Sequence, residues 1–158
     1  MRSAFWASTH STCRGPLGMP DPAHGGETFM AFDFGERRIG VALGNSLTGG
    51  ARPLCVVEEE RRDSRFAQIE SLIREWGPTQ LVVGLPVYPD GARHPFAARC
   101  ERFANQLRGR FALPVTLADE RWTSALAPGQ TAIDAEAAAI LLQSVLDTLS
   151  AHAPLHPN

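Results

Sequence analysis

An aspartate stands inside an apolar run in the segment FMAFDFGERRIGVALGN at 29–45. Asp33 lies between Phe32 and Phe34, where an ionised carboxylate is costly unless a cation or hydrogen-bond donors meet it. Gly35 follows, and such a glycine often marks a close approach of the backbone to another group. The pattern indicates an anion or metal site at the end of a strand. A turn aspartate that bonds its own backbone would give the same pattern.

Further carboxylates stand at the ends of other expected elements. Asp119 and Glu120 follow the apolar segment at 114–118, and Asp134 lies in the first turn of the expected last helix. In an open α/β sheet, sites form outside the carboxyl ends of the strands, so these acids can meet there. Clustered carboxylates raise one another's pKa unless cations neutralise them, and hard oxygen ligands select Mg²⁺ or Mn²⁺. A pair of such ions hydrolyses phosphodiesters by activating water and stabilising the leaving oxygen.

Each of these acids also has an ordinary structural explanation. Asp119 can cap a turn, and Glu120 can pair with Arg121. Asp134 follows Thr131 by three positions, as in a capping box that starts a helix. The coincidence of all of them at strand or helix ends favours a shared site.

Basic residues and one loop are expected around the same edge. The loop PVYPDG at 86–91 follows a central strand and could contact a substrate backbone, although Asp90 and Gly91 also suit a plain turn. The rim would be a local basic patch for phosphates. Its predicted substrate contacts are Gly35, Arg37, Arg38, Arg93 and Arg121, and Arg99, Arg102, Arg108 and Arg110 either extend it or form a solvated helix face.

Hydrophobic periodicity predicts the elements that position these residues. Strands are expected at about 28–34, 39–44, 51–57, 81–85 and 114–118, and helices at about 64–76, 96–107 and 131–150. Tight links make the first three strands an antiparallel meander, and Pro53 marks an edge or bulge position. The apolar fourth strand is typical of a buried parallel position. The order predicts an α/β fold with a mixed five-stranded sheet, a meander plus parallel strands, flanked by helices.

The last expected helix is apolar over much of its length. Its predicted buried stripe consists of Ile133, Ala137, Ile140, Leu141, Val145 and Leu149.

Length and composition bound the possibilities. The 158 residues suit one domain, expected at 28–152, with a disordered leader at 1–27 and a frayed tail at 153–158. A net charge of −2 gives no overall attraction to nucleic acid or membrane, so any such contact needs a local patch. The three cysteines are far apart, which argues against a zinc knuckle or disulfide framework. With no apolar run of membrane-spanning length, a cytoplasmic protein is expected.

Five segments together resemble the RuvX (YqgF) family of pre-16S rRNA nucleases, also described as Holliday-junction-resolvase-like. The resemblance runs from about 29 to 148. The segments are FDFGERRIGVALG at 32–44, LTGGARPL at 47–54, VVGLPVYPDG at 82–91, DERWTS at 119–124 and IDAEAAAILLQSVLD at 133–147.

The resemblance implies an RNase H-like fold and a metal-dependent nuclease that processes the 5′ end of pre-16S rRNA. By position, Asp33 is the first-strand acid, Asp119 and Glu120 belong to the DER motif, and Asp134 is the last-helix acid. The predicted catalytic residues are therefore these four acids. Asp33, Glu120 and Asp134 are the expected ligands of Mg²⁺ or Mn²⁺, and Asp119 is a supporting carboxylate.

Departures from the family pattern leave alternatives open. The segment between the DER motif and the last helix is short, at 125–130, Trp122 replaces the usual Leu, and 92–94 lacks the familiar polar run. A Holliday junction resolvase is one alternative, and it would need a two-fold homodimer. A non-catalytic RNA- or protein-binding factor on the same fold is another. An actin-like ATPase is disfavoured, because its nucleotide cleft needs two such domains.

Overall fold

The computed structural model describes residues 26–58, 61–88, 90–119 and 131–152. All eight predicted elements are present, with small shifts at their ends. They are β1 (Thr28–Phe34), β2 (Arg38–Asn45), β3 (Gly50–Glu58), α1 (Arg62–Trp76), β4 (Gln80–Leu85), α2 (Ala97–Phe111), β5 (Val115–Asp119) and α3 (Thr131–His152). The predicted leader (apart from residues 26 and 27) and the predicted tail lie outside the described residues and stay predictions.

The sheet has the predicted mixed architecture, with the strand order β3-β2-β1-β4-β5. β1 pairs antiparallel with β2, which pairs antiparallel with β3, whereas β4 runs parallel to both β1 and β5. The register of β2 and β3 shifts between Val41 and Ala42, opposite Pro53. Pro53 is tolerated there because it lies on an edge strand at a bulge, where the missing N–H costs no central ladder bond.

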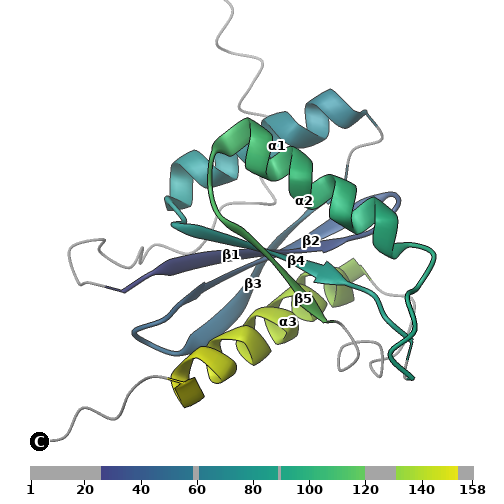
Figure 1. Ribbon diagram of the computed structural model, residues 1–158. Coiled ribbons are helices and arrows are strands. Elements are labelled where there is room, and N and C mark those ends of the chain that lie inside the picture. The colour runs from purple at the N-terminus through teal and green to yellow at the C-terminus, as the bar shows by residue number, and fades with distance from the viewer. Residues whose placement is uncertain (1–25, 59–60, 89, 120–130, 153–158) are drawn as a thin grey trace, which may run out of the picture.

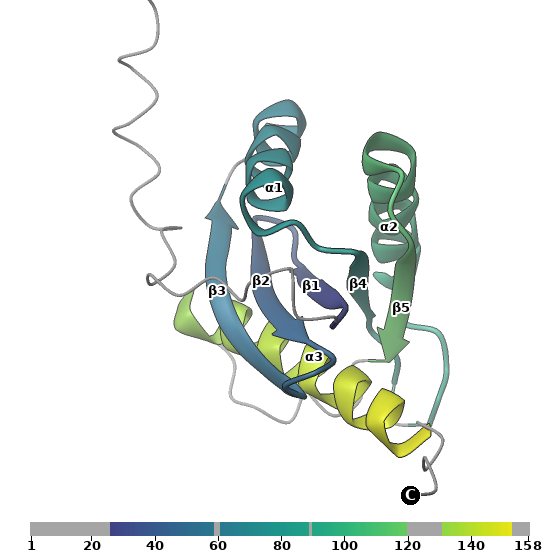
Figure 2. The ribbon, with the colours of Figure 1, turned by 90° about the vertical axis from the view of Figure 1, so that its left-hand side faces the viewer.

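Helices cover both faces of the sheet (Figure 1), with α1 and α2 on one face and α3 on the other (Figure 2). Alternation along β1 divides its side chains between these two layers. Met30 and Phe32 join the core under α1 and α2, whereas Phe29 and Ala31 join the core under α3. Phe34 packs against the core under α1 and α2. Because consecutive side chains of a strand point to opposite faces, Asp33 belongs to the row that faces α3.

The first two helices bury the faces that their periodicity predicts. α1 buries Phe66, Ile69, Leu72 and Trp76, and it ends at Gly77, whose φ of 56° lies in the left-handed region that favours glycine. α2 buries Ala97, Cys100, Phe103, Ala104 and Leu107. Within the described residues, no helix is both long and apolar enough to cross a membrane.

The predicted stripe of α3 is correct in part. Leu141 is buried and Val145 packs against the core under α3, whereas Ile140 and Leu149 are wrong, because they are 37% and 45% exposed. The side chain of Ile133 lies outside the described part of the chain. A helix that is apolar on several sides gives little periodicity, so side-chain size decides which face packs. Among the described side chains of α3, the buried ones are Ala135, Ala138, Ala139, Leu141, Leu142 and Leu146.

Small residues on the sheet complete this contact. Gly40, Ala42 and Gly44 alternate along β2 and form the row that faces α3. A β-carbon at Gly44 would lie 2.9 Å from Leu146 and 3.0 Å from Leu142. The helix therefore lies closer to β2 than larger residues would allow, and its register over the sheet is fixed.

Candidate carboxylate site at the end of the sheet

Asp33 is placed at the end of β1 by a tight turn. The Gly35 N–H donates a 2.9 Å hydrogen bond to the Arg38 carbonyl, which closes the connection from β1 to β2. Asp33 pairs with Gly40 across the two strands. Directly paired residues point to the same face of a sheet, so the half-buried Asp33 side chain shares the α3 face with Gly40.

Gly40 is also where α3 meets the sheet. A β-carbon at Gly40 would overlap the main-chain carbonyl of Asp134 and would lie 2.8 Å from the nitrogen of Ala135. The first turn of α3 therefore rests directly on β2 at the partner of Asp33. Since neighbouring strands are about 5 Å apart, Asp33 and the backbone of Asp134 lie roughly one strand spacing from each other. The structure thus places the main chain of Asp134 about one strand from Asp33, although the two residues come from opposite ends of the domain.

Asp119 lies on the other side of the sheet. It ends β5 and pairs with Leu85 of β4. Val115 and Leu117 alternate with it and pack into the core under α1 and α2, whereas Ala118 packs toward α3. The exposed Asp119 therefore faces the α1 and α2 layer, away from Asp33. Glu120 and Arg121 lie outside the described residues, and their predicted roles stay predictions.

The chemistry of this edge follows from its oxygen donors. Asp33 and Asp134 supply carboxylates of the kind that Mg²⁺ and Mn²⁺ prefer. Among the described residues, no group of three or more His, Cys, Asp or Glu side chains lies close enough to hold a metal ion. The described part of the chain therefore supplies two acids, which fit a hard divalent cation as part of a larger ligand set.

The predicted basic rim is partly occupied by exposed ion pairs. Arg38 pairs with Glu58 at 3.2 Å, and Arg93 pairs with Glu101 at 2.7 Å. Such surface pairs contribute about 0–1 kcal/mol, so an incoming phosphate can replace them. Arg37 is exposed in the β1–β2 turn and makes no ion pair within the described ranges.

The loop after β4 has the structural role that its sequence allowed. Asp90 accepts a 2.9 Å hydrogen bond from the backbone N–H of Ala92. Val87 and Arg93 form an isolated antiparallel bridge that closes the loop. Asp90 and Gly91 therefore build a turn, and Gly91 takes a φ of 86°.

Sequence reasoning missed the part played by Gly40. The available signal was the alternation of Gly40, Ala42 and Gly44, three small residues on one face of a buried strand. That pattern indicates that another backbone comes close to the strand. It could have identified β2 as the strand on which the last helix packs.

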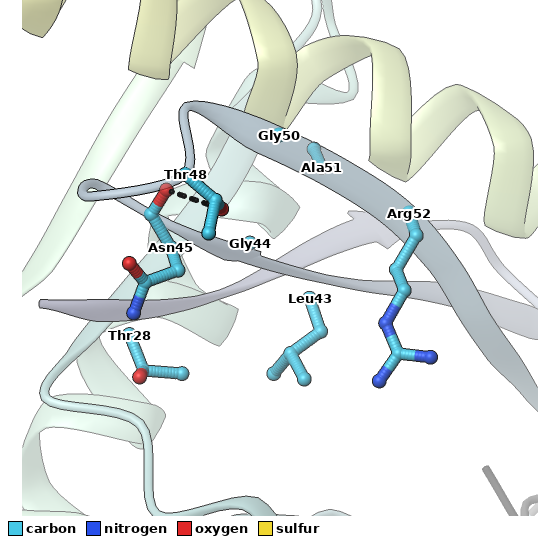
Figure 3. A pocket seen from close by; sticks show the side chains of 8 residues that line it. All are labelled: Thr28, Leu43, Gly44, Asn45, Thr48, Gly50, Ala51 and Arg52. Carbon is cyan, nitrogen blue, oxygen red and sulfur yellow. Dashed lines mark hydrogen bonds between the residues drawn. The ribbon is translucent and has the colours of Figure 1, made fainter. Parts of the chain in front are cut away.

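A separate pocket lies at the opposite end of β1 and β2 (Figure 3). It has a volume of about 310 Å³, and Thr28, Leu43 and Arg52 are among the residues that line it. In Figure 3 these side chains point away from α3. With β1 rising about 3.3 Å per residue, Thr28 lies roughly 17 Å from Asp33, and Leu43, which pairs with Met30, lies roughly 10 Å along the strands from Asp33. The pocket is not part of the carboxylate site.

Comparison with known proteins identifies the family. The profile of the family described as "RuvX: Holliday junction resolvase" matches residues 27–148. This chain belongs to the RuvX family. The resemblance predicted from five short segments is therefore confirmed, and it extends through every described element up to Thr148 of α3.

Relatives of this RuvX-family chain match it over most of its length. A protein of Paraburkholderia phytofirmans, named "Putative pre-16S rRNA nuclease", is 52% identical over 137 residues, which cover 82% of this chain and 94% of the relative. A Burkholderia multivorans protein of the same name is 48% identical over 139 residues, with 80% and 93% covered. The solved structure "T. thermophilus RuvC in complex with Holliday junction substrate" has a TM-score of 0.50 at 15% identity and covers 79% of this chain and 96% of that one. That likeness supports the RNase H-like fold.

Proposed function

We propose that this RuvX-family protein is a divalent-metal-dependent nuclease of the cytoplasm that hydrolyses RNA phosphodiester bonds at the 5′ end of pre-16S rRNA. The observation that supports the proposal is the contact of α3 with Gly40, because the main chain of Asp134 rests on the strand residue that pairs with Asp33. The names of the relatives, "Putative pre-16S rRNA nuclease", support the substrate.

The residues have separable tasks in this proposal. Asp33, Asp134 and Glu120 would hold Mg²⁺ or Mn²⁺, and the bound ions would activate water and stabilise the leaving oxygen. The turn at Gly35 holds Asp33 at the end of its strand, and the alanine-rich face of α3 holds Asp134 against β2. Arg37 and Arg38, on the rim, would orient the phosphates on either side of the scissile bond.

Substitution of Asp33 tests this proposal directly. Asp33→Asn keeps the shape of the side chain and removes the charge that a cation needs, so we expect Mn²⁺-dependent cleavage of a pre-16S 5′ fragment to fall at least about 100-fold. The melting temperature should change by no more than about 2 °C. Asp147→Asn, at the other end of α3, is the matched control and should cleave like the wild type. Wild-type cleavage by Asp33→Asn would refute the assignment.

Holliday junction resolution is a second candidate, favoured by the description of the family that matches the chain. A resolvase makes paired cuts across a symmetric junction and would need a two-fold homodimer. The same assay with a four-way DNA junction, together with sedimentation at the assay concentration, separates the two candidates. Paired cuts by a dimer would establish resolution, and a strict monomer would contradict it. Binding without cleavage of either substrate would indicate a non-catalytic factor.

A further inference from the structure

A second concentration of positive charge lies between α1 and α2, on the sheet face opposite α3. It is a groove of about 370 Å³ beside the β1–β2 turn. Its charged lining consists of Arg62 and Arg65 from α1, Arg99 and Arg102 from α2, and Glu36 from the turn. Four arginines against one glutamate give a formal charge of +3, in a chain whose net charge is −2. The groove is therefore a local attractor for anions.

Within the described part of the chain, Glu36 contacts two of these arginines. Arg99 donates to the Glu36 carboxylate at 2.6 Å, and Arg65 donates to the Glu36 carbonyl at 3.2 Å. Within the described ranges, Arg62 and Arg102 form no ion pair, and both are exposed. The groove thus holds a surplus of guanidinium groups that an external anion can satisfy.

Aromatic rings keep the arginines of the groove in place. The floor contains Phe34 and Phe103, whose rings stack at 4.6 Å between centroids. The Arg65 guanidinium lies 5.9 Å from the centre of the Phe34 ring, and that of Arg99 lies 5.6 Å from Phe96. A guanidinium held over an aromatic face loses less side-chain entropy when it binds a ligand, and its fork geometry matches phosphate bidentately.

The groove is next to the carboxylate site although it lies on the other face of the sheet. Phe34 lines the groove, and the preceding residue, Asp33, faces α3. The β1–β2 turn, with Gly35 and Arg37, connects the two. A flexible polyanion that reaches Asp33 can therefore continue over this turn into the groove.

We propose that the groove between α1 and α2 binds the sugar-phosphate backbone of a single RNA strand, namely the part that flanks the bond held at the carboxylate site. Phosphates replace Glu36 as the partner of Arg99 and bind directly to Arg62 and Arg102. The flanking position rests on the proposed nuclease function, whereas binding of the strand in the groove does not.

The test measures binding of a 5′-labelled single-stranded pre-16S fragment in EDTA over a range of salt concentrations. The variants are Arg62→Gln, Arg102→Gln and the double variant. Each lost phosphate contact should lower the slope of log affinity against log salt by about 0.7, so the double variant should lose about 1.4. If the wild type and the double variant bind equally at 1 M salt, the double variant should bind roughly 25-fold more weakly than the wild type at 0.1 M salt.

Arg74→Gln is the matched control, because it removes the same charge from the last turn of α1, outside the groove. It should keep the wild-type slope and affinity, and Arg102→Lys should restore most of the slope because it restores the charge. A wild-type slope and affinity in the double variant would overturn the proposal. So would equal displacement of the RNA by polyglutamate, which would identify an acidic polypeptide as the ligand. In EDTA, Arg62→Gln and Arg102→Gln should weaken binding equally in the presence and absence of Asp33→Asn, so loss of the nuclease proposal and loss of the groove proposal give different results.

Discussion

Replacement of Gly40 by alanine tests how the last helix positions the carboxylate site. The new methyl group would overlap the main-chain carbonyl of Asp134, and a backbone atom cannot rotate away as the end of a side chain can. The start of α3 must therefore lift from β2. Overpacking of a core costs about 1–3 kcal/mol, and we expect about 3 kcal/mol here because the obstacle is backbone. In a domain of this size that loss lowers the melting temperature by roughly 10 °C.

Thermal and urea unfolding followed by circular dichroism measure this loss. Gly109→Ala is the matched control, since Gly109 lies in α2 with nothing within 4 Å of an added β-carbon. The control should stabilise the protein by about 0.5–1 kcal/mol, because alanine is the better helix former. If Gly40→Ala destabilises the protein and Gly109→Ala stabilises it, the contact with α3 decides the change in stability, and the loss of a glycine by itself does not. A melting temperature for Gly40→Ala equal to the wild type would refute the described packing of α3.

Gly40→Ala also predicts a functional result. The substitution moves the backbone that carries Asp134 relative to Asp33, and a ligand displaced by about 1 Å can cost roughly 100-fold in rate. We expect metal-dependent cleavage to fall by about that factor at a temperature where the variant is still folded. Full activity in the folded variant would mean that Asp134 is not a ligand, or that α3 packs on β2 again without a change in the position of Asp134.

Three further substitutions test the packing of α3 and the basic rim. Leu142→Ala should cost about 3 kcal/mol because this side chain of α3 is fully buried against the sheet. Leu149→Ala should cost under about 1 kcal/mol because Leu149 is 45% exposed. Equal costs in urea unfolding would contradict the observed buried face of the helix. Glu58→Gln frees Arg38 from its exposed ion pair, so it should change stability by less than about 1 kcal/mol while it strengthens RNA binding at low salt. Unchanged affinity would remove Arg38 from the substrate rim.

The fold was predictable because local signals agreed with one another. Alternating or continuous apolar runs marked the strands, and Gly77 and Pro78 ended α1 where the helical period stopped. The predicted buried face of α3 was only partly correct, because a helix rich in alanine and leucine offers several apolar faces. The choice among them depends on the small residues of β2, which belong to a distant part of the chain.

The site was only partly predictable, because strand ends indicate an edge but not a face. Asp33, Asp119 and Asp134 all stand near element ends, yet alternation along β5 turns Asp119 toward α1 and α2. The arginine groove was even harder to predict from the sequence. Spacing along α2 shows that Arg99 and Arg102 share a helix side, but only the placement of α1 beside them makes a concave, positively charged surface.

Alternation along β1 explains how one short segment can serve two kinds of chemistry. Asp33 and Phe34 are consecutive, so they point to opposite faces, the first to the carboxylate site and the second to the arginine groove. A one-residue slip of β1 would exchange the two faces and bury the carboxylate among aromatic rings, which is unfavourable for an ionised group. The hydrogen bond from Gly35 to Arg38 and the pairing of Asp33 with Gly40 prevent that slip. The turn at 35–38 therefore sets the register on which both sites depend.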